Sequence, residues 1–198
     1  MKKIILTIMA VAAFGTANAQ EETPSGEGFS KGDMFAEGSF SFRSGDVVDS
    51  WAFNPSIGYM LDENWAVGGR LNFGGYKDND GDKQSVLGVT GFARYYFLTL
   101  GEDKSFNAFG EAGIGYSAVT TEPNGMDKST DNNMNATISL GLNYFFTDHW
   151  AATFTLANIL QYNSFSPENG DNSSDLQVEV NLFNNIFAQP QFGLLYKW

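Results

Sequence analysis

The sequence predicts an all-β fold: an eight-stranded antiparallel up-and-down transmembrane β-barrel. First, the chain of 198 residues is rich in aromatic residues (18 Phe, 8 Tyr and 4 Trp) and in glycine (22), a composition typical of β architecture. Second, no stretch after the N-terminal segment approaches the roughly 18 consecutive apolar residues of a membrane helix. Third, apolar and polar residues alternate with a period of two in eight segments of about ten to thirteen residues, which suits tilted strands that cross a bilayer.

The N-terminus predicts export. Met1-Lys2-Lys3 is basic, Ile4 to Phe14 is apolar apart from one Thr, and Ala17-Asn18-Ala19 is a small-residue cleavage site before Gln20. This pattern is typical of a secretory signal peptide and is too short for a membrane span. We therefore predict a signal peptide at residues 1–19 with cleavage between Ala19 and Gln20. A flexible polar N-terminal segment at 20–31 and a barrel domain at 32–198 follow.

The charge and cysteine content narrow the function classes. Removing residues 1–19 takes away two of the 11 Lys and Arg residues and none of the 23 Asp and Glu residues, so the mature chain carries 9 − 23 = −14. Nucleic acid is therefore not an expected partner. The sequence has no cysteine, so we expect neither a disulfide framework nor a lipoprotein anchor.

Each predicted strand has one apolar face and one face of Gly, Ser, Asn, Thr and a few charged residues. A soluble β-sandwich or a secreted lipocalin-like barrel also alternates, but its polar face lies outside and is rich in Lys and Glu. A face of small polar residues instead suits a cramped barrel interior. In chain order, the apolar faces are marked by Phe40 and Phe42; Trp51, Ile57 and Tyr59; Trp65, Val67 and Leu71; Leu87, Val89 and Tyr95; Phe106, Ile114 and Tyr116; Ile138, Leu140 and Tyr144; Trp150, Phe154 and Leu156; and Phe192, Leu194 and Tyr196.

The connections alternate in length. Tight turns are predicted at 62–64, 101–104 and 147–149, and polar loops at 44–50, 76–84, 120–133 and 163–175. Short periplasmic turns and longer external loops are typical of outer-membrane barrels. Residues 176–183 alternate as an extension that leads into the last strand, Ile186 to Trp198.

Three places in the predicted strands break the regular pattern. Alternation loosens at Asn158-Ile159, where we expect a bulge or the end of the membrane span. Pro55 and Pro190 lie within strands although proline cannot donate to the ladder, so we expect bulges there and leave the local register open.

Ten aromatic residues lie at strand ends beside the short turns. Amphipathic rings collect at the headgroup level of a membrane. We therefore predict an interfacial girdle made of Tyr59, Trp65, Tyr95, Phe97, Phe106, Tyr144, Phe146, Trp150, Tyr196 and Trp198.

Four charged residues fall on the predicted interior face at a similar depth: Glu37, Arg70, Arg94 and Glu111. An eight-stranded barrel is only wide enough to be filled by side chains, and an unpaired buried charge is costly. We therefore predict an ionic cluster that closes the lumen. Its alternative is a gate whose charges re-pair to open a small pore.

We expect no catalytic, cofactor or metal site. The single histidine, His149, lies in a predicted periplasmic turn, where we interpret it as a solvated residue, and a hydrolase would need a base beside a nucleophile. The run from Asp78 to Asp82 lacks the spacing and the closing glutamate of a calcium-binding loop, which leaves a polar hairpin.

The C-terminal Phe192-Gly193-Leu194-Leu195-Tyr196-Lys197-Trp198, the Ala19-Gln20 processing site and the eight alternating segments together carry a family resemblance. The chain resembles the small outer-membrane β-barrel family and looks closest to the porin-family barrel domains of Bacteroidetes-type bacteria. The OmpA transmembrane domain and OmpX are architectural relatives. The resemblance covers essentially the whole mature chain. It implies a Gram-negative outer membrane location, and recognition of Trp198 as an assembly signal by the barrel-assembly machinery.

The resemblance supports architecture more than activity. We expect a non-enzymatic monomer in contact with outer-membrane lipid and lipopolysaccharide, with a structural or surface-interaction role or a narrow porin-like channel. The alternatives are a small-solute diffusion pore, an outer-leaflet lipid enzyme and a soluble secreted lipocalin-like ligand-binding barrel. The sequence does not identify partners of the surface loops.

Overall fold

A computed structural model describes residues 28–44, 48–78, 81–101, 104–124, 127–166, 173–178 and 191–198. The predicted signal peptide, its cleavage site, residues 20–27 of the predicted flexible segment and Pro190 lie outside these ranges. Within them, the chain is built from β-strands, and no helix is long and apolar enough to span a membrane. The strands are β1 (Met34–Ser44), β2 (Val48–Met60), β3 (Trp65–Asp78), β4 (Lys83–Leu100), β5 (Phe106–Glu122), β6 (Ser129–Phe145), β7 (Trp150–Ser166), β8 (Ser173–Val178) and β9 (Gln191–Lys197).

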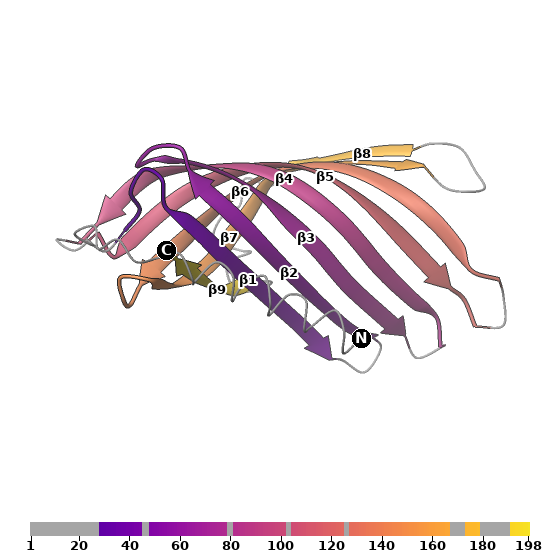
Figure 1. Cartoon of the computed structure of the whole chain (residues 1–198). Helices are drawn as coiled ribbons and strands as arrows, with labels where there is room; N and C mark the ends of the chain where they lie inside the picture. The colour runs from indigo at the N-terminus through magenta and orange to yellow at the C-terminus, as the bar shows by residue number, and fades with distance from the viewer. Residues whose placement is uncertain are drawn as a thin grey trace.

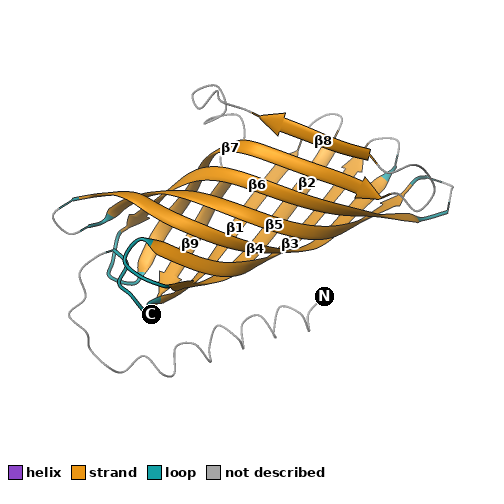
Figure 2. Ribbon diagram, turned by 90° about the horizontal axis from the view of Figure 1, so that it is seen from above, coloured by secondary structure: helices purple, strands orange, loops and turns teal. Residues whose placement is uncertain are grey.

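The strands form a closed antiparallel circuit. Each strand from β1 to β7 pairs with the next in sequence, β7 also pairs with β9, and β9 pairs with β1. The prediction of an eight-stranded up-and-down barrel is confirmed in this circuit, and the tilted wall is visible in Figures 1 and 2. At the seam, Met34 and Trp198 exchange backbone hydrogen bonds of 3.0 and 2.9 Å.

Two separate segments, β8 and β9, occupy the place of the eighth strand. β9 pairs with the first part of β7, from Trp150 to Thr155, whereas β8 pairs with its later part, from Leu160 to Phe165. Residues 176–178 of the predicted extension lie in β8, and residues 191–197 of the predicted last strand form β9. The chain between β8 and β9 lies outside the described residues.

Several predicted loops are in fact strand. β4 to β7 have 17 or 18 residues each, and their ladders continue through much of the segments 76–84, 120–133 and 163–175. The polar composition is typical of loops, but Thr and Ser side chains can hydrogen-bond across paired strands, as the hydroxyls of Thr120 and Thr130 do at 3.2 Å. The hairpins therefore continue as β-structure beyond the apolar part of the wall.

The predicted faces are confirmed by burial. Most residues that mark the apolar face are exposed on the outside, such as Phe40 at 58% and Ile114 at 62%, while Glu37, Arg94 and Glu111 are at most 8% exposed. The aromatic girdle also lies on the outer face, where the rings of Trp65 and Tyr95 lie 4.8 Å apart. An outer face of exposed apolar side chains matches a lipid surround.

The bulge prediction is confirmed at one place and wrong at another. In the pairing of β7 with β6, Leu160 lies opposite Ile138 and Asn158 lies opposite Ser139, so Ile159 between them has no partner. Leu156 is left without a partner in the same way. Pro55, in contrast, causes no register shift: Phe53 pairs with Phe73 and Ser56 with Arg70, so the register is the same on both sides. The ladder toward β3 is interrupted beside Pro55, while pairing with β1 continues. The missing N–H is therefore tolerated without an inserted residue.

Candidate functional site

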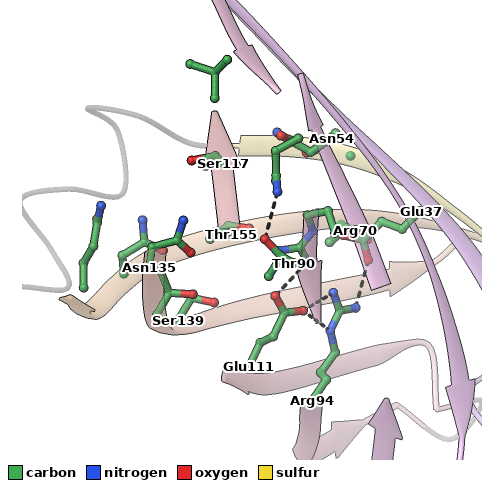
Figure 3. Close-up of a pocket in the computed structure, with 18 of the residues that line it drawn as sticks. Glu37, Asn54, Arg70, Thr90, Arg94, Glu111, Ser117, Asn135, Ser139 and Thr155 are labelled. Carbon is green, nitrogen blue, oxygen red and sulfur yellow. Dashed lines mark hydrogen bonds and ion pairs between the residues drawn. The ribbon is translucent and has the colours of Figure 1, made fainter. Parts of the chain in front are cut away.

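The four predicted interior charges meet in one cluster that crosses the lumen. Arg94 on β4 lies between two carboxylates: its Nη1 donates to Glu37 Oε2 on β1 (2.9 Å), and its Nε and Nη2 donate to Glu111 Oε2 on β5 (3.0 and 2.8 Å). Arg70 on β3 donates from Nη2 to Glu111 Oε1 (2.8 Å). Figure 3 shows Arg94 between Glu37 and Glu111. Two arginines and two glutamates give the cluster no net charge.

A polar chain extends the cluster to the opposite wall. Arg94 Nη1 donates to the hydroxyl oxygen of Tyr96 (3.3 Å), Asn143 Nδ2 on β6 donates to the same oxygen (3.1 Å), and Thr153 Oγ1 on β7 donates to Asn143 Oδ1 (3.1 Å). Asn143 is completely buried and Thr153 is 3% exposed. Bonded groups therefore reach across the lumen from β1 to β7.

Aromatic rings enclose the guanidinium of Arg94. Its Cζ lies 4.0 Å from the ring centroid of Phe109 and 5.5 Å from those of Phe35 and Phe92. Cations are attracted to ring faces, and more strongly when water is excluded. These contacts and the two carboxylates compensate the desolvation of an arginine that is 1% exposed.

Three lumen aromatics lie against glycines of the neighbouring strand. Phe35, Phe92 and Phe109 are directly paired with Gly58, Gly68 and Gly141. A Cβ at Gly58, Gly68 or Gly141 would lie 2.2–2.4 Å from the Cζ of the ring opposite it. The glycines thus provide the space in which large rings fit inside a narrow barrel.

On the side of the ionic cluster that faces the short turns, which we expect to be periplasmic, a second layer of rings fills the lumen. Phe29 lies with its ring centroid 4.7 Å from Tyr96, 5.1 Å from Phe145 and 5.5 Å from Phe35. Tyr96 also packs on Phe109 at 5.6 Å. We call Phe29, Phe35, Tyr96, Phe109 and Phe145 the aromatic layer; each is at most 7% exposed.

Phe29 comes from the segment predicted to be flexible, and for residues 28–31 that prediction is wrong. Lys197 Nζ donates to the carbonyl oxygen of Gly28 and lies 3.6 Å from Asp33 Oδ2. The backbone N–H of Gly32 donates to Met60 O (3.0 Å), and Met60 N–H donates to Asp33 O (2.9 Å). Burial of the Phe29 ring, reinforced by these bonds, holds the segment in the mouth of the barrel.

On the side of the ionic cluster that faces the long hairpins, which we expect to be the outer side of the membrane, the lumen holds a polar cavity of about 310 Å³. Its lining includes Asn54, Asn72, Asn135 and Thr155, and the ionic cluster forms its floor. Asn72 Nδ2 donates to Thr90 Oγ1 (2.9 Å) in its wall. In the described residues, the lumen is therefore a polar cavity that ends at the ionic cluster, with the aromatic layer behind it.

The remaining sequence candidates lie away from this lumen. His149 is exposed, as expected, but its Nδ1 lies 3.0 Å from Lys197 O and its backbone oxygen accepts from Lys197 N–H (2.7 Å), so it also holds the last strand. Asp78 Oδ1 accepts from Asp82 N–H (2.9 Å) and Asp82 Oδ1 from Asn124 N–H (2.8 Å). The Asp78 carboxylate therefore supports the turn of its own hairpin, and the Asp82 carboxylate links this hairpin to the one between β5 and β6.

The period-two alternation of the sequence predicts that the four charges lie together, but it does not predict the aromatic layer. Phe35, Phe92, Tyr96 and Phe109 lie on the interior face of their strands, which otherwise carries small and polar residues. Glycines directly opposite them were a usable signal once the register is known. The burial of Phe29 cannot be predicted from the period-two alternation of a strand, because Phe29 precedes the first strand.

Comparisons with known proteins agree with this architecture. The chain matches the family model described as outer membrane protein beta-barrel domain over residues 6–183. No curated protein matches it. It is similar to the outer membrane protein OprG from Pseudomonas aeruginosa (19% identity, TM-score 0.53, covering 86% of this chain and 98% of that one). It is also similar to Neisserial surface protein A (13% identity, TM-score 0.50, covering 84% and 94%). At these identities the likeness shows the fold alone.

Proposed function

The chain belongs to the outer membrane protein β-barrel family, and from that premise we propose that it is a sealed, non-enzymatic barrel of the outer membrane with a structural and surface-interaction role. The observation that carries this proposal is the two-layer closure of the lumen. An ion entering from the outer side meets first the neutral cluster of Glu37, Arg70, Arg94 and Glu111, and then the aromatic layer.

The aromatic layer weighs most against a diffusion pore. Phe35 is 0% exposed, Tyr96 and Phe145 1%, and Phe29 7%. An ion crossing this layer would lose its hydration among rings, which is costly in a low-dielectric environment. Solute passage would therefore require the Phe29 segment to leave.

The external hairpins support a surface role. β5 and β6 stay paired as far as Thr121 and Ser129, and Lys128 Nζ lies 2.8 Å from Glu122 Oε1 beyond that pair. Paired strands present a defined surface, in contrast to a free loop. We propose that lipopolysaccharide surrounds this surface. We further propose that the barrel is a monomer and that the barrel-assembly machinery is its partner during biogenesis.

Osmotic swelling tests the sealed barrel. The protein is reconstituted into liposomes, diluted into isotonic salt, sugar or amino acid, and compared with a general porin at the same protein-to-lipid ratio. We expect no swelling above that of empty liposomes, with correct folding verified by faster migration of the unboiled protein on SDS gels. Swelling at the rate of the porin would refute the proposal.

One observation favours a narrow gated channel as a second candidate. Arg70 is 22% exposed, faces the cavity and bonds the cluster through one described contact, to Glu111. In this alternative, Arg70 leaves Glu111 and the cluster re-pairs. Single-channel recording of Phe29→Ala, which opens the aromatic layer and leaves the ionic cluster intact, decides it: silent traces exclude gating by the cluster, and repeated opening and closing that Glu111→Ala abolishes supports it.

A further inference from the structure

The polar cavity has the composition of a binding site for hydroxyl groups. Of the 21 described residues that line it, seven have side-chain amides and seven have side-chain hydroxyls. The four charged lining residues bond to one another. Among the large side chains in this lining, only Val86 and Phe109 are apolar. The cavity therefore offers many hydrogen-bonding groups, little apolar surface and no net charge.

The amides concentrate on β6 and β7. Asn135 and Asn163 are directly paired across these strands, and Asn158, opposite Ser139, joins the lining between the two irregularities of β7. Thr153 and Thr155 both face the lumen, so without a bulge the next inward residues would be 157 and 159, and Asn158 would face outward. The bulges thus add an amide to the cavity wall.

At least one polar atom in this wall lacks a partner. Asn133 Oδ1 is buried and accepts no hydrogen bond from the described chain. Buried acceptors are nearly always bonded, to protein, water or ligand. That oxygen has almost no accessible surface, so a bound hydroxyl group would donate to it only after the Asn133 side chain turns toward the cavity, where the neighbouring amides can donate in return.

We propose that this cavity binds a small neutral polyhydroxylated molecule, a sugar or a polyol, which enters from the outer side. A hydroxyl group both donates and accepts hydrogen bonds, so it can pair with the oxygen and with the NH₂ of side-chain amides. A volume of about 310 Å³ holds the equivalent of roughly ten waters, which is the scale of a monosaccharide. This inference rests on the proposed sealed barrel, because a closed floor makes the cavity a site of retention and not of passage.

Isothermal titration of the full-length protein tests the inference. The probes are glucose, galactose and sorbitol, with glucose 6-phosphate as the charged comparison, and the detergent is an amine oxide because glycoside detergents carry sugar headgroups. Asn135→Leu removes an amide from the cavity wall. Asn132→Leu is the matched control, since Asn132 is exposed on the same strand and is not among the residues lining the cavity.

We expect saturable binding of at least one neutral probe, a loss of about tenfold or more in affinity in Asn135→Leu, as for one or two lost hydrogen bonds, and no change in Asn132→Leu. Saturation-transfer NMR on the same samples checks weak binding, and unboiled gel migration checks that both variants fold. Absence of binding to every neutral probe, equal affinity in the two variants, or preference for glucose 6-phosphate would overturn the inference. Liposome swelling is measured separately. If the barrel conducts and still binds sugar, the sealed barrel is refuted and sugar binding is not.

Discussion

Replacement of Glu111 by glutamine probes the ionic cluster with little change in shape. Glu111 accepts three bonds, one from Arg70 (2.8 Å) and two from Arg94 (3.0 and 2.8 Å), and is 6% exposed. Glu111→Gln removes one negative charge and places an NH₂ group, which cannot accept a hydrogen bond, against either Arg70 or Arg94. The cluster then carries one excess positive charge, with Glu37 as the remaining described anion bonded to Arg94.

The expected cost follows from these contacts. Charge-assisted hydrogen bonds contribute about 1.5–3 kcal/mol each, and the amide oxygen retains part of them. Removal of one partner from a buried ion pair costs about 3–5 kcal/mol, because the other charge stays desolvated. We therefore expect Glu111→Gln to lower the free energy of unfolding by about 3–5 kcal/mol.

Urea unfolding in lipid vesicles, followed by tryptophan fluorescence and extrapolated linearly to water, measures this change. Glu122→Gln is the matched control, since Glu122 pairs with Lys128 on the exposed hairpin, and we expect no measurable effect. Arg70→Gln combined with Glu111→Gln restores neutrality and should recover about 1 kcal/mol or more relative to the sum of the single variants. A Glu111→Gln effect as small as that of Glu122→Gln would refute the buried cluster.

Three further predictions concern packing, access and assembly. Gly141→Ala places a methyl group against the Phe109 ring (2.3 Å from Cζ) and should lower the yield of heat-modifiable barrel, whereas Gly91→Ala, with no atom within 4 Å of its added Cβ, should leave that yield unchanged. The chain has no cysteine, so Asn135→Cys should react with a membrane-impermeant thiol reagent added to intact cells. Asn107→Cys should not react, because Asn107 is 3% exposed and lies near the short turns, which we expect to face the periplasm. Trp198→Ala should reduce the amount of protein in the outer-membrane fraction, while Trp198→Phe should preserve it; equal amounts would remove the role of Trp198 as an assembly signal.

The fold was largely predictable because a barrel wall imposes a strict period of two. Side chains such as Ile114 and Glu111 alternate between lipid and lumen, and both faces are read directly from the sequence. The register was less predictable. Pro55 keeps the register although it cannot donate to the ladder, and strand length was underestimated because Thr120 and Thr130 pair outside the apolar belt, with their hydroxyls 3.2 Å apart.

Of the candidate site, only the ionic cluster could be predicted from the sequence. Burial in a narrow lumen requires that Arg94 and Glu111 find partners, so their presence on one face predicts the cluster. The closure by Phe29 depends on a residue before the first strand, held by Lys197 and Met60 from distant parts of the chain. No local pattern encodes such a contact, and the polar composition around Phe29 suggested a flexible segment.

Planar-bilayer recording tests the central claim, that the ionic cluster and the aromatic layer seal the barrel. The wild-type protein is compared with a variant in which both layers are opened, Phe29→Ala combined with Glu111→Ala, and both are first shown to be folded by unboiled gel migration. We predict silent traces for the wild type and discrete conductance steps for the variant. Steps from the wild type, or silence from the folded variant, would contradict the account.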